Sequence, residues 1–144
     1  MFVSDEKFNE IGKYIFTYTD EFIDLICINY ELPEWFMCKY HKNLNWDHIC
    51  MYQGLSIEFV KEHLLYINWK AMSVSRNLST EFVREFINKL DWDSITKYID
   101  LNKAFIQEFY DKLNFKILKQ RNLIEEFMTD TEFELLEVMG KLTE

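Results

Sequence analysis

The sequence predicts an all-α protein: an α-solenoid of helical hairpins with divergent terminal caps. Three observations predict it: an internal repeat of 23 residues, two helix-start signals in each repeat, and no strand-like alternation. The repeat is seen in four sets of aligned positions, called columns below. These columns hold Trp46, Trp69, Trp92 and Phe115; Phe36, Phe59, Phe82 and Phe105; Leu32, Leu55, Leu78 and Leu101; and Asn45, Asn68, Asp91 and Asn114. Because all four columns keep one phase, chance is a poor explanation.

The repeat divides the chain into one predicted domain, 1–144, with three parts. An N-terminal cap covers 1–31, four hairpin repeats cover 32–122, and a C-terminal cap covers 123–144. The units are 32–54, 55–77, 78–100 and 101–122, so the fourth is one residue shorter than the others. A hairpin of this size cannot bury its aromatic stripe alone, and stacking on neighbours would give it a continuous core.

The third unit shows the expected pair of helices. Ser79 is a good N-cap, and Glu81 follows in the first turn, where the helix dipole favours an acid. The apolar residues then recur at helical spacing, as Phe82, Val83, Phe86, Ile87 and Leu90. Asp91 is placed to cap a second, shorter helix that carries Trp92, Ile95 and Tyr98.

Both ends of the chain depart from the repeat, as terminal units of a stack should. In 1–31 the phase is lost, and Phe8, Ile11 and Tyr14 suggest a capping helix. In 123–144, the segment from Thr131 to Glu134 reads as a capping box that opens a last helix, which Gly140 could stop.

Composition excludes several classes of protein. With 144 residues, 17% aromatic, three Gly and one Pro, the chain is neither disordered nor collagen-like. Three cysteines, an odd number, and no leader-like start favour a reduced, cytoplasmic protein, and no apolar run approaches a membrane span. The net charge of −9 disfavours direct binding to nucleic acid or to an anionic membrane.

The acidity is concentrated in the caps. The net charge is −5 over 1–31, +2 over 32–122 and −6 over 123–144. A polar outer face on terminal repeats explains this through solubility alone. The alternative is that the acidic ends imitate phosphates and bind a basic groove on a partner protein.

No recognisable catalytic, metal or cofactor site is predicted. Cys38, His41, His48 and Cys50 are the best metal candidates, yet their spacing is a poor match to structural zinc. His63 aligns with Phe86 and Phe109 and is expected in the core, as is His41 from its own column, whereas Cys38 falls in an exposed column. No nucleophile elbow, oxyanion setting or phosphate-binding glycine loop is present.

The pattern of the third unit, Leu-Ser-x-Glu-Phe-Val-x-Glu-Phe followed by Asp-Trp-x-x-Ile, resembles a short α-helical repeat of bacteriophage and large DNA virus proteins. The resemblance covers 32–122, and unit four departs from it with Asn102-Lys103-Ala104. It implies a helical repeat fold and a viral or phage setting, in the host cytoplasm, and it brings no catalytic residues.

We therefore expect a non-catalytic protein that binds another macromolecule, as a phage- or virus-encoded inhibitor of a host defence or nucleic-acid-processing protein, acting by occlusion. The expected partner is a protein, with a basic nucleic-acid-binding surface as one candidate. The predicted contacts lie in exposed columns, at Trp35, Lys61, Glu62, Arg84, Glu85 and Glu108. Trp35 aligns with two glutamates, so it either anchors a partner or packs on the N-terminal cap. The alternatives are a structural, self-assembling repeat protein and, further off, an enzyme or zinc protein using Cys and His residues.

Overall fold

The computed structural model describes residues 3–142, and only the backbone is described for 133, 136, 137 and 140–142. Within these residues the regular structure is entirely helical, which confirms the all-α prediction. None of these helices is long and apolar enough to cross a membrane.

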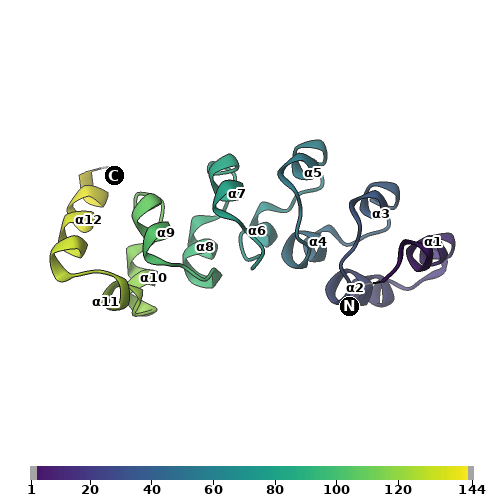
Figure 1. Ribbon diagram of the computed structural model, residues 1–144, viewed down its shortest axis with the longest axis horizontal. Helices are drawn as coiled ribbons and strands as arrows, with labels where there is room; N and C mark the ends of the chain where they lie inside the picture. Colours follow the sequence, from purple (N-terminus) through teal and green to yellow (C-terminus); the bar gives the residue numbers. More distant parts are fainter. Residues whose placement is uncertain (1–2, 143–144) are drawn as a thin grey trace.

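Each of the four units contains two helices. They are α3 (Glu34–Lys39) and α4 (Trp46–Tyr52), α5 (Ile57–Glu62) and α6 (Trp69–Met72), α7 (Thr80–Glu85) and α8 (Trp92–Tyr98), and α9 (Lys103–Glu108) and α10 (Phe115–Gln120). Figure 1 shows these hairpins following one another along the long axis, with the first helices in one row and the second helices in the other. In the row of second helices, α4 contacts both α2 and α6, and α10 contacts both α8 and α11.

The helix starts follow from the sequence. The first helices of units two, three and four begin where the side chains of Ser56, Ser79 and Asn102 accept a backbone N–H three residues ahead. The second helices begin at the Asn/Asp column, whose side chains accept the same kind of bond. In unit one, Pro33 takes the N-cap position of α3 without a side-chain bond.

The core is built between neighbouring units. Trp46, Trp69 and Trp92 each contact the aromatic ring 17 residues later, in the following unit, with centroids 5.2–5.9 Å apart. The partners are His63, Phe86 and Phe109, and each of these rings also contacts a Phe four residues earlier on its own helix. Every unit is thereby tied to the next through one aromatic cluster.

Polar contacts repeat between the same units. Asn45, Asn68 and Asn114 each donate from Nδ2 to an aspartate 21 residues earlier, at 2.8–2.9 Å; the acceptors are Asp24, Asp47 and Asp93. In the remaining unit the cap is Asp91, and the column that supplies those aspartates holds Lys70 instead. In that unit the cap position is acidic where the other units have Asn, and the partner position is basic where the others have Asp.

Side chains from following units also cover the carbonyl ends of second helices. Gln53 donates to the carbonyls of Cys27 and Tyr30 at 2.7 and 2.8 Å, and Arg121 donates to those of Thr96 and Ile99 at 2.6 and 2.9 Å. These carbonyls lack partners within their own helices, so the next unit satisfies them.

The N-terminal cap contains more structure than the single helix predicted. It holds α1 (Asp5–Lys13), a 3₁₀ turn η1 (Ile15–Thr17) and α2 (Asp20–Asn29), which Thr19 caps. Phe8 and Ile15 are buried in a core shared with units one and two, whereas Tyr14 is exposed.

The C-terminal cap begins with α11 (Leu123–Phe127), which follows Asn122 in the left-handed conformation at φ 58°. The last helix, α12 (Asp130–Leu142), starts one residue before Thr131, because the capping box is made by Thr129 and Glu132. The prediction of a Thr131 box was therefore wrong, and the helix also continues past Gly140.

The Asn-to-Asp contacts make a stability prediction. Asn114→Asp keeps an N-cap acceptor but removes the donor to Asp93 and places two carboxylates together, so unfolding free energy should fall by about 1–2 kcal/mol. Adding Asp93→Lys, which imitates the Lys70 and Asp91 pair, should recover part of this loss in urea denaturation. Asn88→Asp, at an exposed position, serves as the control and should change stability by less than about 0.5 kcal/mol. Equal losses of unfolding free energy for Asn114→Asp and Asn88→Asp would contradict a stabilising role for the Asn-to-Asp contacts between units.

Candidate functional site

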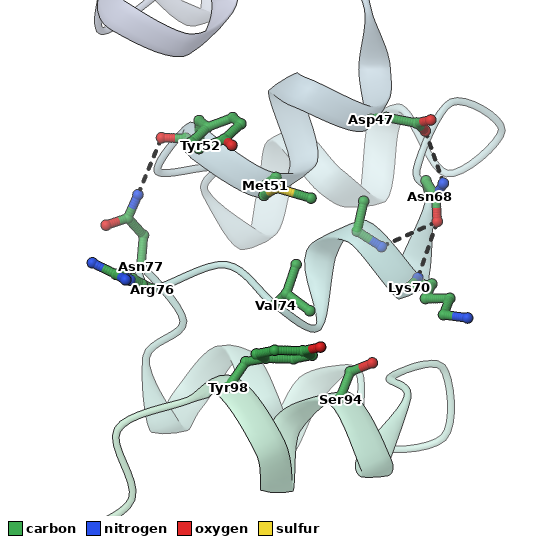
Figure 2. Close-up of a pocket in the computed structure, with 11 residues that line it drawn as sticks. Asp47, Met51, Tyr52, Asn68, Lys70, Val74, Arg76, Asn77, Ser94 and Tyr98 are labelled. Carbon is green, nitrogen blue, oxygen red and sulfur yellow. Dashed lines mark hydrogen bonds between the residues drawn. The ribbon is translucent and has the colours of Figure 1, made fainter.

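A hollow of about 1000 Å³ opens on the row of second helices, across α4, α6 and α8. Figure 2 shows Met51 and Tyr52 above it, Val74 near its middle, and Ser94 and Tyr98 below. Its size is at the upper end of pockets that hold small ligands, and it draws residues from three consecutive units. We refer to this surface, lined by Asp47, Met51, Tyr52, Asn68, Lys70, Ala71, Val74, Arg76, Asn77, Ser94 and Tyr98, as the hollow.

The hollow is located where the second unit departs from its neighbours. Helix α6 has four residues, whereas α4 and α8 have seven each. After Met72, residues 73–77 continue as turns, and Val74, Arg76 and Asn77 of this segment line the hollow. The buried Ser73 comes directly after α6, and its hydroxyl donates to the carbonyl of Trp69 at 2.6 Å and accepts the N–H of Asp91 at 2.7 Å. Thr96 makes the same two contacts within α8, so the second unit keeps this link to the next unit although its helix is shorter.

The lining combines exposed aromatic rings with cations. Tyr52 and Tyr98 are 45% and 54% exposed, although large aromatic residues usually bury more of their surface. Lys70 and Arg76 are exposed and form no ion pair with any described residue. Figure 2 places these two cations at opposite edges of the hollow. Asp47 is the acid of the lining, and its carboxylate already accepts from Asn68.

The other row of helices carries most of the contacts predicted from the sequence, and there the charges are paired. Lys61 on α5 forms an ion pair with Glu85 on α7, and Arg84 on α7 forms a two-bond pair with Glu108 on α9. The Arg84 guanidinium lowers the pKa of the Glu108 carboxyl. Glu62 is exposed beside this series. A partner contact at these residues stays a prediction, and binding there would compete with pairs already made.

Trp35 lies half-buried against the N-terminal cap. Its indole N–H donates to Asp5 at 3.1 Å, and its ring meets Phe36 edge-on at 5.7 Å. The structure thus gives Trp35 a packing role, and its role as a partner anchor stays a prediction.

The three cysteines separate into two buried thiols and one exposed thiol. Cys27 and Cys50 are buried, and desolvation raises the pKa of each thiol to about 11. The thiols of Cys27 and Cys50 face the backbone N–H groups of the N-cap residues Asn45 and Asn68. In the next two units, the hydroxyls of Ser73 and Thr96 accept the corresponding N–H groups, those of Asp91 and Asn114. These two cysteines are therefore part of the contacts between units.

Cys38 is exposed, as its column predicts, and lies 3.5 Å from Nε2 of His63. Nδ1 of His63 is 2.8 Å from the carbonyl oxygen of Phe59, and it donates there because a carbonyl oxygen can only accept. Partial burial, followed by the charges of Glu62 and Glu34, raises the pKa of Cys38. Among the described residues, no group of three or more His, Cys, Asp or Glu side chains is placed to hold a metal ion.

Sequence reasoning did not find the hollow. At the aligned positions that line the hollow, the residue types change from unit to unit, so no repeated pattern marks the site. The sequence did contain a signal that the second unit differs from the first. Lys70 replaces the aspartate of its column, and Ser73 and Ser75 stand where the first unit has Cys50 and Tyr52. The predicted core position of His41 was wrong as well: the ring is only half-buried, and the aligned Leu64 is 42% exposed.

No family model, curated protein or solved structure matches this chain. The site is therefore interpreted from its own geometry and chemistry.

Thiol reactivity tests the description of the cysteines. A disulfide reagent should modify one thiol per native chain, Cys38, and the other two only on unfolding. Because the thiolate reacts and partial burial raises the pKa of Cys38 above that of a free thiol, the rate should keep rising with pH into the alkaline range. Cys38→Ser should abolish the native reaction. A rate that levels off near pH 7 would instead indicate a thiolate activated by His63.

Proposed function

We propose that the four units form an α-solenoid and that the protein binds a segment of another protein in the hollow, acting by occlusion rather than catalysis. The observation that carries this proposal is the combination, in one concave surface, of two exposed tyrosines with two unpaired cations. Tyr and Arg are enriched at protein interfaces and supply much of the binding energy there.

Rigidity of the surface also supports binding. The hollow is formed by helices and by turns that are tied to neighbouring units through Ser73, Asn77 and the side-chain amide of Asn68, which donates to Asp47. Asn77, for example, donates to the carbonyl of Tyr52 at 3.4 Å. A site whose side chains are positioned before binding loses less entropy when a partner docks.

The likeness of the repeat to those of phage and large DNA virus proteins supports a viral setting. In that setting we propose that the partner is a host protein of defence or nucleic-acid processing, met in the host cytoplasm. The acidic caps, at −5 and −6, would assist by drawing the chain toward a basic partner surface.

A second candidate is self-assembly through the ends. It is favoured by apolar side chains exposed on helices of the two caps, notably Leu135 at 61% and Val138 at 56% on α12, and Leu25 at 56% on α2. Because both caps are acidic, their repulsion opposes end-to-end contact at low salt and is screened at high salt.

The test is affinity capture from host lysate, with nuclease, on four forms of the full chain. We expect the unchanged chain to retain a stoichiometric protein, Tyr52→Ala/Tyr98→Ala to lose it about tenfold or more, and the control Tyr14→Ala, another exposed tyrosine, to retain it. The variant Arg84→Ala, on the other row of helices, should also retain it, unless the contacts predicted from the sequence are the true ones.

Two outcomes would overturn the proposal. A partner held equally by all variants would place binding outside the hollow. Recovery of the chain alone, with light scattering that shows oligomers at high salt, would favour self-assembly instead.

A further inference from the structure

We infer that the hollow takes an acidic segment in which an apolar side chain lies between carboxylates. This inference rests on the proposed function, because it names the chemistry of the partner at the proposed site. It is carried by the way apolar and cationic groups are distributed along the hollow.

The middle of the hollow is apolar. Met51 and Val74 are half-buried there, the buried Ala71 adds to the lining, and the ring of Tyr98 lies below Val74 in Figure 2. An apolar side chain that enters this space removes its own surface and that of the lining from water, which favours binding by about 25 cal/mol per Å² of apolar area.

Each edge of the hollow carries one cation, and the Lys70 edge also holds the carboxylate of Asp47, which accepts from Asn68 (Figure 2). Arg76 lies at one edge beside Tyr52 and Asn77, and Lys70 lies at the other beside Asn68 (Figure 2). Beyond Tyr98, Lys97 adds a third positive charge, with its ammonium 4.9 Å from the centre of the Tyr98 ring. Since neither Lys70 nor Arg76 has an ion-pair partner among residues 3–142, a ligand carboxylate need not displace one.

Three cations on the row of first helices are paired, unlike those of the hollow, and this difference supports an acidic partner for the hollow. There, the cations Lys61, Arg84 and Lys103 are each paired with a glutamate of a following unit or of α12. The cations of the hollow stand unpaired in a chain that carries 25 acids against 16 bases. An acidic segment is the partner that supplies the missing charges.

Nucleic acid also carries negative charge, but it fits the hollow less well. A polyanion would extend past the hollow toward the acidic caps and meet their repulsion, whereas a short segment places its few carboxylates at the two edges only. The apolar middle also suits an aliphatic or aromatic side chain better than a phosphate.

The test is selection of a displayed library of random peptides on the immobilised full chain. We expect enriched peptides to carry Asp or Glu on both sides of an apolar residue. A synthetic copy of the enriched sequence should bind the chain and lose about tenfold in affinity with Lys70→Glu/Arg76→Glu, a loss equal to about 1.4 kcal/mol. Its binding should also weaken as salt is raised.

The matched control is Lys42→Glu/Lys116→Glu, which makes the same change in net charge at two exposed lysines outside the hollow. This variant should change affinity by less than about twofold, since exposed charges far from a contact contribute little. Circular dichroism of each variant checks that the helices are kept.

The outcomes separate this inference from the proposed function. Neutral or basic peptides that need Tyr52 and Tyr98 but not Lys70 and Arg76 would overturn the inference and leave the hollow as the binding site. An equal loss with the control variant, or preferential binding of a single-stranded oligonucleotide probe at the hollow, would also overturn it. Peptides indifferent to every hollow variant, or no enrichment, would overturn both.

Discussion

The structure depends above all on the contact between a tryptophan of one unit and the aromatic ring 17 residues later, which is made three times. This contact joins Trp46 to His63, Trp69 to Phe86 and Trp92 to Phe109, always from one hairpin to the next. A hairpin of two short helices has no interior of its own, because its aromatic face needs a second layer to exclude water. The constant spacing of the contact keeps successive units in one register, and it brings Asn and Asp side chains together between units one and two and between units three and four.

The polar contacts follow from that spacing. Once the rings are in register, the Asn column reaches the aspartates of the preceding unit, and the Cys27, Cys50, Ser73 and Thr96 column meets the N–H groups of the caps. The hollow arises because one unit keeps its aromatic contact but ends its second helix early. The rings hold α4, α6 and α8 in the row while residues 73–77 turn away from the helical path. An irregular segment can therefore line a site without disturbing the aromatic contacts between units.

Much of the fold could be predicted from the sequence, because helix starts and burial depend on local residues. Ser79, Asp91 and the Phe82 and Phe86 stripe act as expected from their types and spacing. The failures have physical reasons. His41 was expected in the core because it aligns with Leu64 and Ile87, but this column follows the end of each first helix and is only partly covered. The Thr-x-x-Glu pattern occurs twice, from Thr129 and from Thr131, and only the bonds in the structure show that Thr129 and Glu132 form the capping box.

The hollow could not be predicted from the sequence, for a different physical reason. A hollow depends on the space that three units leave unfilled. Its tyrosines, Tyr52 and Tyr98, share one column, but the second unit has Ser75 there, and the column of Asp47 changes to Lys70. The predicted contacts Lys61, Arg84, Glu85 and Glu108 are exposed as expected, yet the sequence did not reveal that they pair with one another. Exposure can be inferred from a repeat, whereas pairing across units needs the distance between helices.

The most direct test of the central contact is a double-mutant cycle between Trp92 and Phe109, each changed to Leu, in chemical denaturation. The account predicts a coupling of about 0.5–1.5 kcal/mol, because the rings meet 5.5 Å apart across the junction. The same cycle between Trp92 and Phe36, which lie in different core clusters, should be additive within about 0.5 kcal/mol. Additive effects for Trp92 and Phe109 would contradict the claim that this contact holds the units together.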